Sequence, residues 1–346
     1  MTLSRQQRNA IGAALGAAAL FGVTVPLAKQ ALLGESPWLI AGLLYLGSGI
    51  GLGVLAIVQR RRWTVARTDL PWLAAAILSG GIIAPVLLML GLGGQPASGA
   101  SLLLVTEGVF TSVIAWCVFR ENVDRRVLLG FLAVTAGTML LFAGPAQHGV
   151  AVVPALYVLG ACLGWAIDNT LTRKVALADA VQLAALKGLI AGVTNASLAI
   201  VLGARWPGAP TVAYVGLLGF LGYGASLVLF VVALRSLGAA RTSAYFASGP
   251  FVGAVAAILL LAEPVTAPLV GAGLLMLIGV WLHVTESHTH EHEHEEVVHD
   301  HFHEHDDHHR HHPDGSAVPP HAHPHRHDRL RHRHGHFPDA HHSHDH

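Results

Sequence analysis

The sequence predicts an all-α polytopic membrane protein, in which ten transmembrane helices form two inverted five-helix repeats and a disordered tail follows. Three observations support this prediction. Only 12% of the 346 residues are charged and 53% are hydrophobic, which is too few charges for the surface of a soluble protein of this size. Apolar windows of about 20 residues recur between Ala10 and His283, and each is long enough to cross a bilayer. One hairpin-like pattern also occurs twice.

Ten spans follow one another along the chain, each an apolar run that ends at a short polar break. They are predicted at residues 10–29, 38–58, 71–92, 98–119, 126–143, 152–172, 181–202, 211–234, 242–261 and 267–284. Arg5 and Arg8 precede the first span in the manner of a secretory signal. No clear cleavage site follows it and nine more spans do, so we expect the first span to be retained.

Proline and small residues mark several spans. Pro26, Pro85 and Pro250 each remove a backbone donor, so each either bends its helix or frees a carbonyl for a substrate. Glycine pairs such as Gly49 and Gly53 favour close packing of helices over contact with a substrate. Asn195 begins a glycosylation pattern, but it lies inside a span, so we do not expect modification there.

The basic residues of the short loops predict the orientation in the cell membrane. With the N-terminus in the cytoplasm, only Arg205 and the helix-end Lys29 lie on the outer side. Thirteen basic residues then lie on the inner side: Arg5, Arg8, Arg60, Arg61, Arg62, Arg67, Arg120, Arg125, Arg126, Arg173, Lys174, Arg235 and Arg241. We therefore expect a multi-pass protein with both termini in the cytoplasm.

The repeated pattern is a hairpin of two apolar runs joined by a short polar break. The copies are Ser98–Phe142 and Ala240–Val284, and a shift of 142 positions lays Glu121 on Glu263 without a gap. A shift of 144 extends the match to the earlier spans. We therefore predict a first repeat at residues 1–146, a second at 147–286 and a tail at 287–346. Because five spans is an odd number, the second repeat enters the membrane inverted, a recurring plan of secondary transporters.

These hairpins resemble the EamA-domain transporters of the drug/metabolite transporter superfamily. The resemblance covers about residues 8 to 285, and Glu121 and Glu263 occupy the recurrent Glu position of that family. It implies two inverted repeats and the export of a small metabolite. In the fourth span, where the family often has proline, this chain has Glu107-Gly108. The stretches GWAIDNTLTRK and LFVVALRSLGAARTSAYF and the histidine-rich tail indicate a subgroup of the family.

Glu107 is the ionisable group predicted to lie deepest in the membrane. It is about ten residues from either end of the fourth span, and carboxyl groups at that depth usually face a protein or water-lined interior. Removal from water favours the protonated form of such a group. Glu107 is therefore predicted to bind a proton or a substrate in turn; the alternative is a protonated carboxyl that only bonds a neighbouring helix.

The other membrane-embedded charges are Lys29, Asp168 and Lys187. Asp168 and Lys187 have similar predicted depths, so we expect a neutralising pair, and Asn169 beside Asp168 is a candidate contact for a polar substrate. Lys29 lies near the outer end of the first span, where its stem can reach water; a pathway role and a structural role stay open. Glu121 and Glu263 lie at helix ends, where a structural role is favoured.

The tail contains most of the 25 histidines, interspersed with Asp and Glu. Its low complexity predicts disorder without a ligand. Neutral imidazole binds Zn²⁺, Ni²⁺, Co²⁺ or Cu²⁺, and residues two apart in an extended chain point to the same side. A pH-responsive tether is the competing interpretation. The alternating residues proposed as metal ligands are His288, His290, His292, His294, His299, His301, His303, His305, His321, His323, His325 and His327.

The leading functional hypothesis is secondary export of a small metabolite or drug-like compound driven by protons, with a metal-binding tail that regulates or buffers. One alternative is transport of a divalent metal ion; another is a membrane metal sensor or buffer that transports nothing. We expect neither an enzyme nor a required cofactor. The expected partners are the lipid bilayer, a small-molecule substrate and metal ions, with a homodimer as an open alternative and no nucleic acid.

Overall fold

The computed structural model describes residues 5–60, 66–119, 125–143, 150–173, 175, 179–237, 239–284, 288–294, 297–303, 321–327 and 330–336. The chain forms two compact units, Met1–Glu286 and Ser287–His346. The described part of the first unit is helical, and the described part of the second consists of β-strands.

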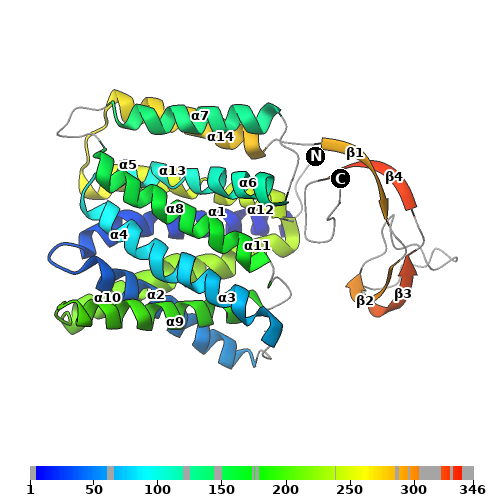
Figure 1. Ribbon diagram of the computed structural model, residues 1–346, viewed down its shortest axis with the longest axis horizontal. Coiled ribbons are helices and arrows are strands. Elements are labelled where there is room, and N and C mark those ends of the chain that lie inside the picture. The colour runs from blue at the N-terminus through cyan, green and yellow to red at the C-terminus, as the bar shows by residue number, and fades with distance from the viewer. Residues whose placement is uncertain are drawn as a thin grey trace. The chain divides into compact units, whose positions relative to one another are not determined.

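The first half of the helical unit begins with two long helices and continues through interrupted ones (Figure 1). Its elements are α1 (Arg5–Ala31), α2 (Pro37–Val58), the 3₁₀ turn η1 (Arg67–Asp69), α3 (Leu70–Ala76), the π-helix η2 (Ile77–Ile83), α4 (Ala84–Gly93), α5 (Ala97–Leu103), α6 (Thr106–Phe119) and α7 (Arg125–Leu141).

The second half also begins with two long helices and continues through interrupted ones. Its elements are α8 (Val152–Arg173), α9 (Ala180–Val201), α10 (Ala209–Gly219), the π-helix η3 (Phe220–Ala225), α11 (Ser226–Leu237), α12 (Ala239–Phe246), α13 (Gly249–Leu261) and α14 (Ala267–Val284).

Eight helical segments of the described chain are long and apolar enough to cross a membrane. They are Gln7–Ala31, Pro37–Val58, Arg67–Gly93, Ala97–Val118, Val152–Thr172, Ala180–Val201, Ala209–Leu234 and Arg241–Leu261. A helix satisfies its own backbone polar groups, which the absence of water in a bilayer requires. The prediction is confirmed for these eight segments. The spans predicted at 126–143 and 267–284 correspond to α7, of 17 residues, and to the shorter apolar helix Ala267–His283, and they stay predictions.

Among the described residues, four interruptions break the regular α-helical hydrogen bonding, two in each half. The π-helices η2 and η3 interrupt one helix of each half. Turns at Leu104–Val105 and at residues 247–248 interrupt another. Pro85 follows η2, whereas Pro250 opens α13 in its first turn, where a missing N–H costs no helical bond. Pro26 lies within the continuous helix α1.

Close contacts between small residues hold the helices together. α2 packs on α9, α1 on α13, α4 on α8 and α7 on α14, and the last pair lies side by side in Figure 1. A Cβ added to Gly188 would lie 2.8 Å from Cα of Gly49, so α2 and α9 meet through their backbones. This bears out the packing role expected of Gly49, whereas a Cβ added to Gly53 would meet nothing within 4 Å. Leu39, Ile40 and Met89 are among the fully buried core side chains.

The tail unit contains β1 (His288–His294), β2 (Val297–His303), β3 (His321–His327) and β4 (Leu330–His336). β1 pairs with β4 and β2 with β3, both antiparallel. The disorder predicted for the tail without a ligand stays a prediction. Alternation with a period of two suits a strand, and the β1–β4 register aligns Glu291 with Arg333 and Glu293 with Arg331.

Candidate functional site

Glu107 lies in the first turn of α6, directly after the interruption that separates α6 from α5. The Thr106 hydroxyl donates to the Leu103 carbonyl over 2.7 Å, which satisfies an oxygen at the end of α5. Asn169 of α8 donates from Nδ2 to Oε1 of the half-buried Glu107 over 2.9 Å. The structure thus brings together two of the predicted pathway residues.

Asp168 and Lys187 form an ion pair between α8 and α9. The Lys187 ammonium lies 2.5 and 2.6 Å from the two carboxylate oxygens of Asp168, and the side chains are only 17% and 10% exposed, respectively. The Thr172 hydroxyl donates to Asp168 over 2.9 Å and accepts from Lys187 over 3.4 Å. The pair therefore has the geometry expected from the similar predicted depths of the two residues.

Gly80 in the π-helix η2 makes room for this ion pair. A Cβ at position 80 would overlap the carboxyl group of Asp168, so a larger residue cannot occupy this position without displacing the ion pair. The Gly80 carbonyl accepts from the Tyr45 hydroxyl over 2.8 Å and from the Trp165 indole over 3.0 Å. The π-helix thus offers a carbonyl to side chains of α2 and α8.

Asn195 of α9 bonds the same interrupted helix. Pro85 has no N–H for the Gly81 carbonyl four residues earlier, and Asn195 donates from Nδ2 to the Gly81 and Ile82 carbonyls, over 3.3 Å each. Of the two interpretations of Pro85, a freed carbonyl is therefore present, and protein is its partner. The sequence analysis missed this role of Asn195; the available signal was an amide side chain inside an apolar span.

Aromatic rings from both halves lie in contact with one another. Centroid distances are 5.6 Å for Tyr45–Tyr223, 6.0 Å for Phe21–Tyr223, 5.6 Å for Phe21–Phe246 and 5.2 Å for Phe230–Phe246. These rings come from α1, α2, η3, α11 and α12. The helical unit therefore contains a half-buried carboxyl group that can exchange a proton, a neutralised ion pair, and a row of aromatic rings that can contact apolar groups.

Lys29 lies in a second polar group, with Glu263 and Gln95, and not with the other pathway candidates. Its ammonium is 3.9 Å from Oε1 of Glu263 and donates to the Gln95 carbonyl. Glu263 accepts from the backbone N–H groups of Ala97 and Ser98 over 2.6 and 2.8 Å. Glu263 thus caps α5, in agreement with the structural role favoured for it, whereas Glu121 lies outside the described residues.

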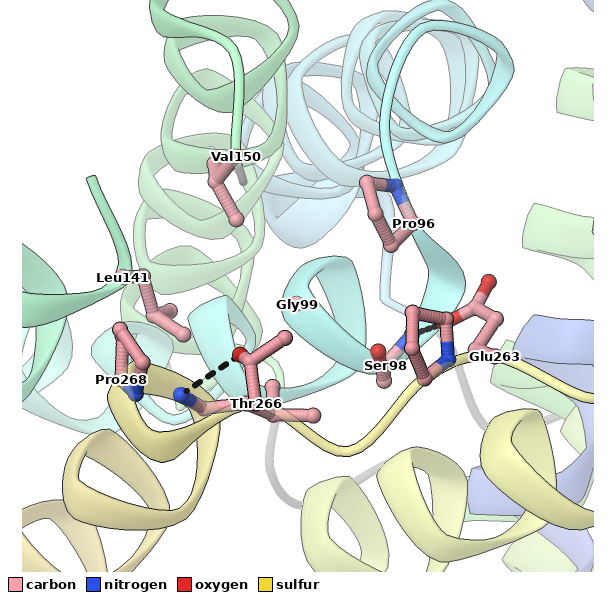
Figure 2. A pocket seen from close by; sticks show the side chains of 10 residues that line it. Pro96, Ser98, Gly99, Leu141, Val150, Glu263, Thr266 and Pro268 are labelled. Carbon is pink, nitrogen blue, oxygen red and sulfur yellow. Dashed lines mark hydrogen bonds between the residues drawn. The ribbon is translucent and has the colours of Figure 1, made fainter. Parts of the chain in front are cut away.

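A small pocket adjoins this second group (Figure 2). Glu263 and Ser98 line one end of the pocket. Toward the other end, the Thr266 hydroxyl accepts a hydrogen bond from the Leu269 N–H over 3.3 Å. The remaining lining includes Pro96, Gly99, Leu141, Val150 and Pro268. The pocket is therefore bordered by the connections that precede α5, α8 and α14.

Possible metal ligands occur in the helical unit and in the tail. In the described part of the chain, no three His, Cys, Asp or Glu side chains come together as a metal site. For the tail, the register pairs His290 with His334 and His292 with His332 in one sheet, and His301 with His323 in the other. His305 lies outside the described residues.

Comparisons with known proteins agree with this architecture. A family model for the EamA-like transporter family matches twice, at residues 8–143 and 153–285. An uncharacterized transporter of Methanothermobacter thermautotrophicus is 26% identical over 281 residues, covering 76% of this chain and 82% of the relative. The uncharacterized transporter YvbV of Bacillus subtilis is 24% identical over 276 residues, covering 78% and 89%.

One solved crystal structure shares the fold, with a TM-score of 0.61 over 79% of this chain and 95% of the other, at 18% sequence identity. The family match covers most of the chain in two copies, and eight described helices are able to span a bilayer. The chain therefore belongs to the EamA-like transporter family and is a multi-pass membrane transporter.

Proposed function

We propose that this transporter exports a small metabolite or drug-like compound in exchange for protons, and that Glu107 binds the proton and the substrate in turn. The observation that carries the proposal is the bond between Glu107 and Asn169 beside the interruption of α5 and α6. An ionisable group inside an apolar helix is a functional candidate by default. Because the Asn169 amide is neutral, it supplies no counter-charge to an ionised Glu107.

The proposed framework is a pair of inverted repeats. Four features support it: the family model matches twice, each half contains one π-helix and one turn-interrupted helix, α1 packs on α13 as α8 packs on α6, and α1 packs on α11 as α8 packs on α4. Interrupted helices at a repeat interface commonly form transport sites. We place both termini in the cytoplasm of a cell, because the basic loop residues favour that orientation.

Proton exchange is tested with purified protein in liposomes that contain a pH-sensitive dye. A compound library is screened for molecules whose addition makes the wild-type protein move protons across the liposome membrane. With a positive compound, Glu107→Gln should remove proton movement, because the amide keeps the size of the side chain and does not titrate. Glu35→Gln, which changes a partly exposed carboxyl group in the α1–α2 connection, is the matched control. Wild-type proton movement by Glu107→Gln would refute the role of Glu107.

We also propose that the tail binds divalent transition metals, and that it thereby regulates transport or buffers the metal ions. Alternating histidines and their cross-strand pairing, such as His290 with His334, support this proposal. Binding of Zn²⁺ and Ni²⁺ to the full chain is compared by calorimetry with a chain ending at Glu286. Binding should require the tail and weaken below about pH 6.5, because only neutral imidazole is a ligand. Equal binding by both chains would refute the proposal, and metal uptake by the full chain would favour the metal-transport alternative.

A further inference from the structure

Glu263 joins the two halves of the protein at the start of α5. It belongs to the connection between α13 and α14, yet both of its carboxylate oxygens accept backbone bonds from the first turn of α5, over 2.6 and 2.8 Å. Lys29, at the end of α1, is 3.9 Å from the same carboxylate. Because hydrogen bonds to an ionised carboxylate are stronger than neutral ones, the two N–H bonds dominate this contact and Lys29 assists it.

The helix held in this way is short and fully buried. All seven residues from Ala97 to Leu103 are buried, and the turn at Leu104–Val105 separates them from α6 and Glu107. A Cβ at Gly253 would lie 2.9 Å from Oγ of Ser101, so α5 lies against α13 through small groups. Small contact groups let the two helices approach closely, with no bulky side chain between them.

The contact also leaves a buried amide unsatisfied. The Gln95 side chain is 4% exposed, and among the described residues neither its nitrogen nor its oxygen has a hydrogen-bond partner. Lys29 bonds the Gln95 backbone carbonyl and does not relieve the side chain. A buried polar group without a partner is unfavourable. The Glu263 cap of α5 therefore lies next to a destabilising group, the Gln95 amide, which would gain hydrogen bonds to water if the contact opened.

We propose that Lys29, Glu263 and the first turn of α5 form a gate at the outer face, and that α5 transmits the state of the gate to Glu107. This inference rests on the proposed proton-exchange function and on the proposed orientation. Release to the outside requires the two halves to separate there, which breaks the Glu263 cap. The freed α5 then shifts relative to α6 at the turn before Glu107. Glu263 and Lys29 act as positioning residues, because neither contacts Glu107.

The gate is tested by labelling from outside the cell. Ser98 is 2% exposed and lies beside Glu263 in Figure 2, so Ser98→Cys in a background without Cys117 reports opening to an impermeant thiol reagent. Glu263→Gln should raise the labelling rate about tenfold, which corresponds to the loss of one charge-assisted hydrogen bond. Lys29→Met should raise it less, and Gln95→Met, which removes the unsatisfied amide, should lower it. The matched control Glu35→Gln should leave it unchanged.

Two further variants separate a gate from a general structural effect. Exchanging the charges, Lys29→Glu with Glu263→Lys, should not restore slow labelling, because lysine cannot accept bonds from the α5 N–H groups. Glu263→Asp keeps the charge on a shorter stem and should give an intermediate rate, and it serves in place of Glu263→Gln if that variant does not fold. Unchanged labelling in the Glu263 variants, or rescue by the exchange, would overturn the gate.

Transmission to Glu107 is read with the same reporter. Glu107→Gln imitates the protonated carboxyl group and should change the Ser98→Cys labelling rate by about threefold or more, a modest coupling between sites. An unchanged rate would overturn transmission through α5. The assay needs neither a substrate nor a proton gradient. Loss of proton movement with unchanged labelling would therefore refute only the present inference, and changed labelling with no proton movement by any compound would refute only the proposed function.

Discussion

Removing one partner of the Asp168–Lys187 ion pair should destabilise the protein more than removing both. In Lys187→Met, the Asp168 carboxylate keeps only the bond from Thr172, while its side chain is 10% exposed. Leaving one member of a buried pair without its partner costs about 3–5 kcal/mol. Asp168→Asn should cost about 2–3 kcal/mol, because the asparagine oxygen and Thr172 still accept from the Lys187 ammonium, which is more exposed.

The double variant Asp168→Asn/Lys187→Met contains no charge, so its cost should fall to about 1–2 kcal/mol. Asparagine is chosen because it keeps the shape that fits against Gly80. The free energy of unfolding is measured by denaturant titration in detergent for the wild type, both single variants and the double variant. The predicted coupling energy is at least about 2 kcal/mol, and effects that add within about 0.5 kcal/mol would refute the paired role.

Two threonines of α8 supply a matched control for the comparison of the single and double variants of Asp168 and Lys187. Thr172 bonds both members of the ion pair, whereas Thr170 donates only to the Ala166 carbonyl of its own helix, over 2.8 Å. Thr172→Val should therefore cost about 1–2 kcal/mol and Thr170→Val less than about 0.5 kcal/mol. Equal costs would show that loss of a hydroxyl group from this helix, and not support of the ion pair, explains the result.

Gly80→Ala should destabilise the protein by about 1–3 kcal/mol, because the new methyl group overlaps the Asp168 carboxyl group and overpacking carries that cost. Gly53→Ala, at a helical glycine with open space around the added carbon, should be neutral or stabilising by up to about 1 kcal/mol; a similar loss in both variants would contradict the explanation. For the topology, a cysteine at Arg205 should react with an impermeant reagent in intact cells and one at Arg67 should not. Labelling at Arg67 would reverse the proposed orientation.

Hydropathy and charge alone located most of the membrane-spanning helices. A run of apolar residues specifies a span because the transfer of each residue from water to lipid depends mainly on its own side chain. The similarity between Ser98–Phe142 and Ala240–Val284 was visible because the two copies keep the same spacing. The pairing of Asp168 with Lys187 also followed, because two opposite charges at a similar depth in an apolar medium have few other ways to be neutralised.

The tail shows what composition does not determine. Low complexity predicts disorder and specifies no pairing, whereas the structure pairs His288–His294 with Leu330–His336 as antiparallel strands. Strand pairing depends on which segments meet, so the register comes from the structure alone.

The tertiary structure decided which polar residues act together. Lys29 was a candidate for the pathway because of its charge inside the first span, yet it pairs with Glu263, a residue more than two hundred positions away. In the sequence, Asn195 was noted only as the start of a glycosylation pattern. Its bonds to the Gly81 and Ile82 carbonyls depend on a π-helix that no local sequence pattern predicted. The physical reason is the range of the forces involved: burial is set by each segment's own composition, whereas a hydrogen bond acts over about 3 Å and exists only once packing has brought its two partners together.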